Sequence, residues 1–201
     1  MEAIARSRSE KPLNRRILDR QRHRLCRADY QRMAEAGIFS EDDHIELIAG
    51  ELIDMPPIGD EHAGLTTQLN HLVYRSGVKD ALVSVQSPLV LDDHNEPEPD
   101  LMLLRFRADY YKRAKPRAAD VLLLIEVADS SLSYDRSVKR PLYAQHGIAE
   151  VWIVNLQDRV VEVHRDPDGQ DYRDSWLARA GDQLQSQQVP DFTLGVSELL
   201  A

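Results

Sequence analysis

The sequence has a single cysteine, no long apolar run and no apolar N-terminal stretch. The lone Cys26 excludes an intramolecular disulfide and a cysteine-based zinc cluster. The longest purely aliphatic run, residues 121–125, is far shorter than the roughly 20 apolar residues that span a bilayer. The N-terminal segment offers no apolar stretch that would act as a secretory signal. These absences predict a cytoplasmic protein without a membrane partner.

Sequence motifs of several common enzyme classes are absent as well. The chain has no G-x-S-x-G nucleophile elbow, no G-x-x-x-x-G-K-[ST] phosphate loop, no G-x-G-x-x-G fingerprint and no H-E-x-x-H zinc motif. None of the seven histidines lies three or four residues from another, so no helical histidine pair offers zinc ligands. A metal in this protein would therefore be held mainly by oxygen atoms.

Charge is unevenly distributed along the chain. Residues 1–27 contain nine Lys and Arg against three Asp and Glu, a net charge of +6, whereas the remainder contains 16 against 31, a net of −15. We expect residues 1–24 to form a flexible basic tail, which either contacts phosphate groups or stays solvated. The acidic remainder is unusual for a protein that binds DNA tightly without sequence preference.

The composition fits one α/β domain over residues 25–201. Apolar residues make up 42% and charged residues 29% of the chain, which are ordinary values for a globular protein. Hydrophobic periodicity and turn residues predict a mixed α/β sheet. In chain order we expect a helix at 28–36, a hairpin at 44–55, a helix at 60–77, strands at 81–91, 100–104 and 121–127, a helix between 133 and 146, a hairpin at 150–165, and then one strand and a short helix at 196–200.

Three residues interrupt these predicted elements. Ala49 suits a tight primed turn poorly, so a bulged loop is the alternative for the first hairpin. Pro88 suggests an edge or a bulge in the strand at 81–91, because proline donates no backbone hydrogen bond. Pro141 must lie in the first turn of its helix or kink it.

Two carboxylates stand at the ends of apolar strands. Glu126 follows the aliphatic run 121–125, and Asp100 precedes the apolar run 101–104. Burying an ionised carboxylate without a partner costs several kcal/mol, so Glu126 needs a cation, a hydrogen-bond donor or an exposed position at the strand end. If the two strands are antiparallel neighbours, the carboxylates face each other, and a divalent cation would relieve their repulsion. Such hard oxygen ligands suit Mg²⁺ or Mn²⁺.

Four further polar residues are candidate members of this site. Lys139 could hold the attacking water or stabilise charge on a phosphate; alternatively it is an exposed helix residue paired with Asp135, four positions earlier. Asp135 itself is a candidate neighbour of the site. Glu46 lies in the first hairpin, where a solvent-facing position is the commoner alternative. His62 either neighbours the site or merely lies in the first turn of a helix.

The order and spacing of four segments carry a family resemblance. The segments are IELIAGELIDMPPIGDEH at 45–62, VQSPLVLDDHNEPEPDLMLL at 85–104, LLLIEVADSSLSYDRSVKRPLYAQHGIAEVWIVNL at 122–156 and QVPDFTLGVSELL at 188–200. Together they resemble the Uma-type restriction endonuclease family, a branch of the PD-(D/E)XK nuclease superfamily, from about Leu25 to the C-terminus. The resemblance implies a restriction-endonuclease-like core with flanking helices and an N-terminal β-hairpin.

The resemblance also implies roles for individual residues. Asp100 resembles the motif aspartate, Glu126 the acidic residue of the D/E-x-K element, and Glu46 the upstream acid that completes the metal site. The sequence departs from the superfamily pattern at Ala128, which stands where the motif lysine is expected. Lys139, in the following helix, would replace that lysine.

These observations predict a metal-dependent endonuclease that hydrolyses DNA phosphodiester bonds, with Mg²⁺ or Mn²⁺ as cofactor. Glu46, Asp100 and Glu126 would bind the metal, and Lys139 would orient the nucleophile. The alternative is a catalytically silent module of the same fold that binds DNA or a protein partner. The sequence leaves the oligomeric state open, with a homodimer as one option.

Overall fold

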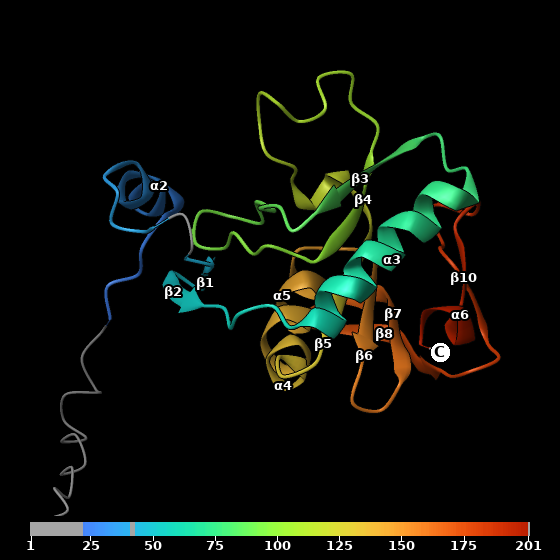
Figure 1. Ribbon diagram of the computed structural model, residues 1–201. Helices are drawn as coiled ribbons and strands as arrows, with labels where there is room; N and C mark the ends of the chain where they lie inside the picture. Colours follow the sequence, from blue (N-terminus) through green and yellow to red (C-terminus); the bar gives the residue numbers. More distant parts are fainter. Residues whose placement is uncertain (1–21, 41–42, 201) are drawn as a thin grey trace, which may run out of the picture.

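The computed structural model describes residues 22–40 and 43–200 (Figure 1). Most of the predicted basic tail, residues 1–21, lies outside the described residues. The following residues contact the first hairpin: Arg22 Nη1 lies 2.8 Å from Glu51 Oε1, and Arg24 Nε donates a 2.9 Å hydrogen bond to the Ala49 carbonyl. No helix in the described ranges is long and apolar enough to cross a membrane.

A six-stranded mixed sheet forms the centre of the protein, which confirms the predicted α/β class. Across the sheet the order is β3 (Ala81–Val85), β4 (Leu101–Arg105), β5 (Val121–Ala128), β6 (Glu150–Asn155), β7 (Val160–Asp168) and β8 (Asp171–Ala178). All neighbouring strands are antiparallel except β5 and β6, which are parallel. The second predicted hairpin is therefore β6 and β7, and β8 is a strand that the sequence does not predict.

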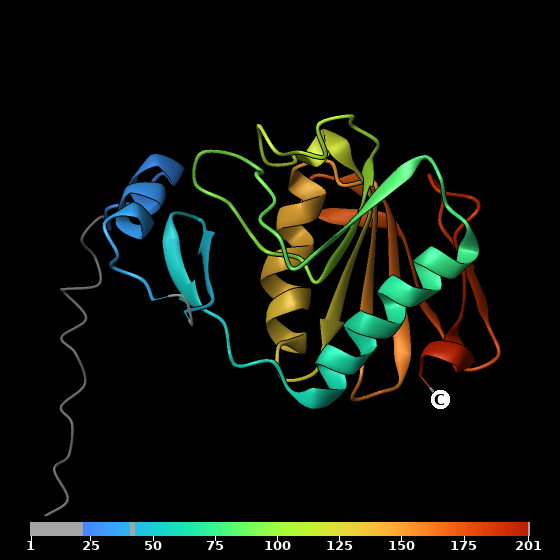
Figure 2. The same ribbon diagram turned by 45° about the horizontal axis from the view of Figure 1, so that its top comes forward.

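Helices cover both faces of this sheet, as Figure 2 shows. The helix α3 (Asp60–Ser76) packs on one face, and the consecutive turns α4 (Leu132–Tyr134), η2 (Asp135–Lys139) and α5 (Arg140–Gln145) lie on the other. Alternate residues of one strand enter opposite cores: Leu101 packs on the α3 side and Met102 on the α5 side. Because both faces are covered, β4 and β5 are continuously apolar over residues 101–104 and 121–125.

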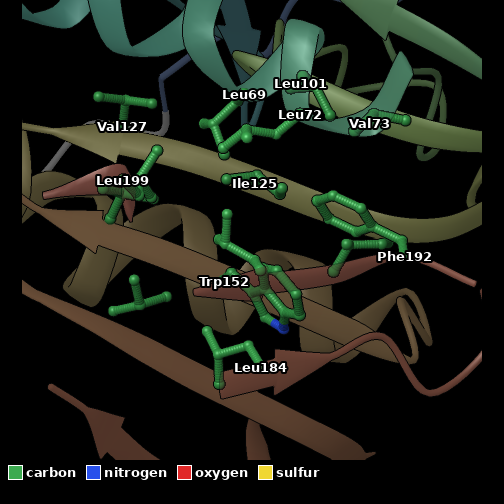
Figure 3. Packing of buried hydrophobic residues seen from close by; sticks show 14 of the residues in the cluster. Leu69, Leu72, Val73, Leu101, Ile125, Val127, Trp152, Leu184, Phe192 and Leu199 are labelled. Carbon is green, nitrogen blue, oxygen red and sulfur yellow. The ribbon is translucent and has the colours of Figure 1, made fainter. Parts of the chain in front are cut away.

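The core on the α3 side is closed by the C-terminal segment (Figure 3). Trp152 of β6 stacks on Phe192 with ring centroids 5.8 Å apart, and neither ring is exposed. Aromatic pairs of this kind contribute about 0.5–1.5 kcal/mol beyond their buried area. The segment contains the short pair β9 (Gln183–Gln185) and β10 (Thr193–Gly195) followed by α6 (Val196–Leu199), so it holds one strand more than expected.

The predicted N-terminal hairpin is a separate two-stranded sheet of β1 (Ile45–Ile48) and β2 (Glu51–Asp54), with α2 (Arg27–Glu35) beside it (Figures 1 and 2). Its register runs without a bulge to the last pair, so the alternative of a bulged loop is wrong. Ala49 and Gly50 both have positive φ, 53° and 77°, as a tight primed turn requires. The Ala49 amide donates a 2.7 Å hydrogen bond to Asn95 Oδ1, which helps to hold this residue in its unfavourable conformation.

Two predicted elements have different limits in the structure. The strand expected at 81–91 ends at Val85, because Gln86 adopts a left-handed φ of 43° and Pro88 follows. The helix expected between 133 and 146 begins at Leu132 and contains the π-helical turn η2. Pro141 lies in the first turn of α5, directly after η2, where its missing N–H interrupts the regular hydrogen-bond pattern.

Candidate active site

The antiparallel pairing of β4 and β5 brings Asp100 and Glu126 together. Leu101 pairs with Ile125, so the next residue on each side of this pair lies at the same end of the two strands. The Asp100 amide N lies 3.3 Å from Glu126 Oε2, and the Val127 amide donates a 2.8 Å hydrogen bond to Asp100 Oδ2. The two strands are therefore antiparallel neighbours, which is the condition under which we expect the two acids to meet, and each carboxylate contacts the backbone of the neighbouring segment.

Glu126 points toward the helical layer of α4, η2 and α5. Its neighbours Ile125 and Val127 pack into the core on the α3 side, and side chains alternate along a strand. Its exposed fraction is only 2%, so the alternative of a strand end in solvent is wrong. A carboxylate buried to this extent requires partners within the protein.

Lys139 is the cationic partner of two buried acids. Its Nζ lies 2.9 Å from Glu46 Oε1 and 3.3 Å from Glu126 Oε1. The three side chains are at most 3% exposed, so neither a solvent-facing Glu46 nor an exposed Lys139 paired with Asp135 is correct. Lys139 is the last residue of η2, and π-helical turns are frequent at functional sites. This one side chain connects the N-terminal hairpin to the central sheet.

His62 and Asp135 lie at the same place. His62 is in the first turn of α3, and its Nε2 lies 3.0 Å from Asp100 Oδ2. This hydrogen bond to Asp100 raises the pKa of His62 above its usual value. Asp135 is 3% exposed and accepts a 2.7 Å hydrogen bond from Ser131 Oγ. The structure thus brings both candidate neighbours to the acids.

Two residues of the site are not predicted from the sequence. The Tyr143 hydroxyl donates a 2.6 Å hydrogen bond to Glu126 Oε1, and the Glu98 amide donates a 2.8 Å hydrogen bond to Glu46 Oε1. Tyr143 follows Lys139 by four residues, the spacing that places two side chains on one face of a helix. That spacing is a signal from which Tyr143 could be found. Glu98 contributes its backbone amide, which any residue except proline has, so the identity of this residue does not predict the contact.

The acids outnumber the cations at this buried site, and the surplus negative charge changes their pKa values. Burial raises the pKa of Glu126, and its acidic neighbours add to the rise although Lys139 opposes it. Burial also raises the pKa of Asp135. Burial alone would lower the pKa of Lys139, but the surrounding carboxylates outweigh it and raise that pKa. Lys139 therefore remains an ammonium, and the surplus charge favours protons on the acids.

The site lines a cavity of about 410 Å³, whose lining also includes residues 55–59 between the hairpin and α3. Among the described residues Glu46 Oε2 is buried without a hydrogen-bond partner, and the acids around it offer the hard oxygen atoms that a divalent cation prefers. Within residues 22–40 and 43–200, no three His, Cys, Asp or Glu side chains are arranged so that they could hold a metal ion as they stand. The donor chemistry fits a divalent cation, but the acids would have to rearrange around it.

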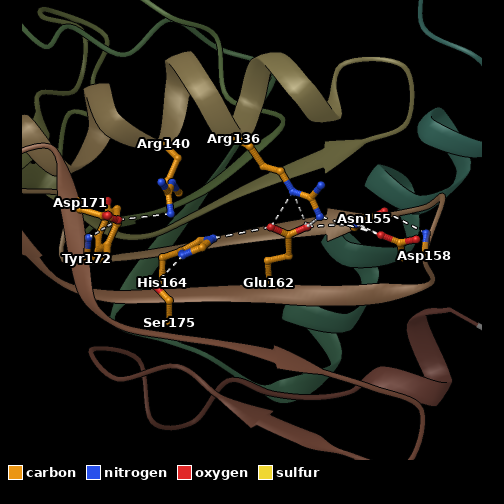
Figure 4. A network of polar contacts seen from close by, with 9 residues as sticks. All are labelled: Arg136, Arg140, Asn155, Asp158, Glu162, His164, Asp171, Tyr172 and Ser175. Carbon is orange, nitrogen blue, oxygen red and sulfur yellow. Dashed lines mark hydrogen bonds and ion pairs between the residues drawn. The ribbon is translucent and has the colours of Figure 1, made fainter.

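A second polar network on the same helical layer is separate from this cavity (Figure 4). Arg136, also in η2, forks onto the carboxylate of Glu162 on β7 at N–O distances of 2.5–3.1 Å. Asn155 donates 3.0 Å hydrogen bonds to Glu162 and Asp158. The turn η2 is therefore fixed to β7 by Arg136 and to β1 and β5 by Lys139.

Comparisons with known proteins agree with this architecture. The Uma2 family model, described as "Putative restriction endonuclease", matches residues 27–197. The crystal structure of a "putative nuclease belonging to DUF820" from Anabaena variabilis ATCC 29413 is similar with a TM-score of 0.64. The two sequences are 15% identical over 84% of this chain and 96% of that chain, so this likeness shows the fold alone. No curated protein matches the chain.

Proposed function

We propose that the chain, which belongs to the Uma2 family, is a metal-dependent endonuclease that hydrolyses DNA phosphodiester bonds. The observation that carries the proposal is that three acids and Lys139, from segments far apart in the sequence, line one cavity. A cluster of buried acids with one lysine provides both cation ligands and a positive charge for a phosphate. The description of the family and that of the similar structure support the nuclease activity.

Glu46, Asp100 and Glu126 would hold Mg²⁺ or Mn²⁺ through their carboxylate oxygens. When bound, such a cation supplies Lewis-acid chemistry: it lowers the pKa of water and neutralises charge that develops on the phosphate. The raised pKa of Glu126 means that binding is favoured at a pH at which this acid can lose its proton.

Lys139, His62 and Tyr143 would act on the nucleophile and on the acids. The Lys139 ammonium, which now neutralises two carboxylates, would orient the attacking water or stabilise charge on the phosphate. His62 and Tyr143 are positioning residues, because they hydrogen-bond to Asp100 and Glu126 and restrict the orientation of these carboxylates.

Cleavage of plasmid and single-stranded DNA tests this proposal. We expect the purified protein to cut with Mg²⁺ or Mn²⁺ and to stop when EDTA is added. Asp100→Asn and Glu126→Gln should each lower the rate on the order of 10³-fold or more, because each removes a charge that holds the metal. Asp168→Asn, which removes an exposed acid of β7, should cut like the wild type. Cutting that survives both site substitutions would contradict this assignment.

The role of Lys139 needs a separate measurement at saturating DNA. Under conditions in which circular dichroism shows that it is folded, Lys139→Ala should bind DNA but cut it more slowly, as expected for a group that acts on the nucleophile or on the transition state. Equal cutting by Lys139→Ala and the wild type would remove this lysine from the mechanism.

A catalytically silent module that binds DNA or a protein partner is the second candidate. Two observations favour it. The chain has a net charge of −9, which disfavours DNA binding. In addition, Lys139 neutralises two of the acids, and the described residues include no complete set of metal ligands. No cutting under several metals and substrates, with DNA binding retained, would favour this candidate. A cytoplasmic location and a homodimer remain predictions, and light scattering by the purified protein tests the second.

A further inference from the structure

A strongly basic, aromatic-rich loop joins β4 to β5 in an otherwise acidic protein. We call residues 105–117, with the sequence RFRADYYKRAKPR, the basic loop. It contains six Lys and Arg and one Asp, a net charge of +5 in a chain whose total is −9. It also contains three aromatic residues, Phe106, Tyr110 and Tyr111. Figure 1 shows the loop projecting beyond the end of the sheet.

The basic loop is held in one shape by contacts within itself. Arg107 forks onto Asp109 at 2.9–3.1 Å, and its guanidinium lies 4.3 Å from the centre of the Tyr111 ring. The Tyr111 hydroxyl donates a 2.8 Å hydrogen bond to the Arg105 carbonyl. Tyr110 and Tyr111 both have positive φ, 52° and 58°, a conformation that costs energy for residues other than glycine. The loop is thus preorganised although its backbone is strained.

This shape leaves aromatic rings and positive charges exposed to solvent. Phe106 and Tyr110 are 55% and 58% exposed and meet edge to face with ring centroids 6.1 Å apart. Lys112, Arg113 and Arg117 are exposed and form no ion pair with any residue of the described ranges. Lys112 Nζ lies 5.8 Å from the centre of the Tyr110 ring. Exposed rings beside cations that have no acidic partner provide stacking surfaces and phosphate contacts at one place.

A groove of about 300 Å³ lies between the basic loop and the outer strand β3. Its lining includes Ser84 of β3, Ser87 just after this strand, and Tyr110 and Lys115 from the loop, so it combines hydroxyl groups, a ring and an ammonium. Lys115 Nζ also lies 2.5 Å from Glu96 Oε1, which ties the loop to the segment that leads to Asp100. The groove is separate from the cavity that contains the acids.

We propose that the basic loop and this groove bind a single nucleic-acid strand, with phosphates at Lys112, Arg113 and Arg117 and unpaired bases stacked on Phe106 and Tyr110. The inference rests on the proposed nuclease function, for which it names the substrate surface. Charge complementarity selects a polyanion, and the exposed rings select unpaired bases over a duplex, whose bases are already stacked. The rest of this acidic protein repels phosphate groups, so contacts to the nucleic-acid backbone would be concentrated in this loop.

The basic loop lies at the opposite end of β4 from Asp100. Arg105, the last residue of β4 and the first of the basic loop, lies five residues beyond Asp100, a distance of roughly 17 Å at about 3.3 Å per residue. The bound strand would therefore be held several nucleotides away from the phosphate at the acids. The loop contributes affinity and orientation and takes no part in bond cleavage.

Fluorescence anisotropy with a labelled oligonucleotide in EDTA tests the proposal without cleavage. The probe is a single strand of about 20 nucleotides, longer than the roughly 4–16 nucleotides that single-strand-binding folds occupy. Lys112→Glu/Arg113→Glu should weaken binding about tenfold or more at low salt and reduce the salt dependence by about 0.7 for each lost phosphate contact. Arg173→Glu/Arg179→Glu makes the same change in charge at the β8 edge of the sheet and should have a much smaller effect.

The stacking contribution has its own pair of variants. Tyr110→Asn removes the ring but keeps a residue that tolerates positive φ, and we expect it to weaken single-strand binding about fivefold or more. Tyr74→Asn removes a ring of α3 that is 84% exposed and should leave binding unchanged. Circular dichroism and melting temperature check that each variant is folded.

Several outcomes would overturn the proposal. They are the absence of oligonucleotide binding by the wild type, equal weakening by the two charge-reversed pairs, or duplex binding as tight as single-strand binding with no effect of Tyr110→Asn. Equally tight binding of polyglutamate would assign the loop to an acidic protein partner instead. Cutting by the wild type is measured separately, so loss of the nuclease proposal and loss of the loop proposal give different results.

Discussion

The Tyr143 hydroxyl donates a 2.6 Å hydrogen bond to Glu126 Oε1, and both side chains are buried. The same carboxylate oxygen lies 3.3 Å from Lys139 Nζ, while Oε2 lies 3.3 Å from the Asp100 amide N. Both oxygens of Glu126 are therefore engaged within the protein. Each of these partners favours the ionised form of an acid whose burial favours the neutral form.

Tyr143→Phe should shift the pH dependence of cutting. The hydroxyl stabilises ionised Glu126, so its loss raises the pKa of Glu126 further above the usual range. If ionised Glu126 is required, the acidic limb of the pH–rate profile should move upward by about one pH unit, as expected for a hydrogen bond to a charged group. The control is Tyr172→Phe, which removes a buried hydroxyl bonded to the Ile148 carbonyl. An equal shift in both variants would exclude a specific effect on Glu126.

Lys139→Met should destabilise the fold strongly at alkaline pH. The substitution leaves Glu46 and Glu126 buried without their ammonium, and breaking a buried pair in this way costs about 3–5 kcal/mol. The loss in unfolding free energy, from urea denaturation, should be smaller near pH 5, because burial raises the pKa of Glu126 and protonation of this acid removes one of the unpaired charges. Adding Glu46→Gln to Lys139→Met should recover part of the loss at pH 8. A cost below about 1 kcal/mol for the single variant would be inconsistent with a buried ion pair.

Divalent cations should raise the melting temperature of the wild type at low ionic strength. A ligand that binds only the folded state adds about 2.7 kcal/mol when its concentration is 100 times its Kd. Asp100→Asn should abolish the response and raise the stability of the metal-free protein, because it removes one of several repelling charges. Asp168→Asn, at an exposed position, should respond like the wild type. A wild-type melt that does not respond to Mg²⁺ or Mn²⁺ would favour the silent module.

His164 should make the protein less stable as the pH falls from about 6.5. Burial, with Arg140 nearby, lowers the pKa of His164 to about 4 (Figure 4). Because the unfolded chain takes up a proton near pH 6.5 and the folded protein does not, the folded state loses up to about 3 kcal/mol between these two values. His164→Leu should flatten this part of the curve of unfolding free energy against pH. Replacement of the exposed His71 by leucine should leave the slope unchanged.

Local patterns predict the elements that are apolar along their length. The strands β4 and β5 follow from aliphatic runs, and the hairpin of β1 and β2 from apolar segments that flank Ala49 and Gly50. In contrast, β8 has one buried residue near each end and exposed residues between them, so its sequence shows no strand pattern. Its position depends on pairing with β7, which a local pattern does not contain.

The candidate site could be predicted only in part, for a related reason. Asp100 and Glu126 stand out because each adjoins an apolar strand. The burial of Glu46 depends on Lys139, more than 90 positions later in the chain, and short strand segments do not reveal such a partner. The basic loop departs from the charge of the rest of the chain, but its exposed rings and positive φ values are visible only in the folded protein.

The separation of the N-terminal hairpin from the central sheet has a consequence for how activity is lost. Glu46 belongs to a two-stranded sheet that is not hydrogen-bonded into the central sheet; its contacts to other segments include the Leu47–Glu96 bridge, the Glu98 amide and the Lys139 ion pair. Local opening of such a unit requires less free energy than global unfolding. Its amide protons should therefore exchange with solvent sooner than those of β5. Denaturant would then abolish activity at a lower concentration than the one that unfolds the core.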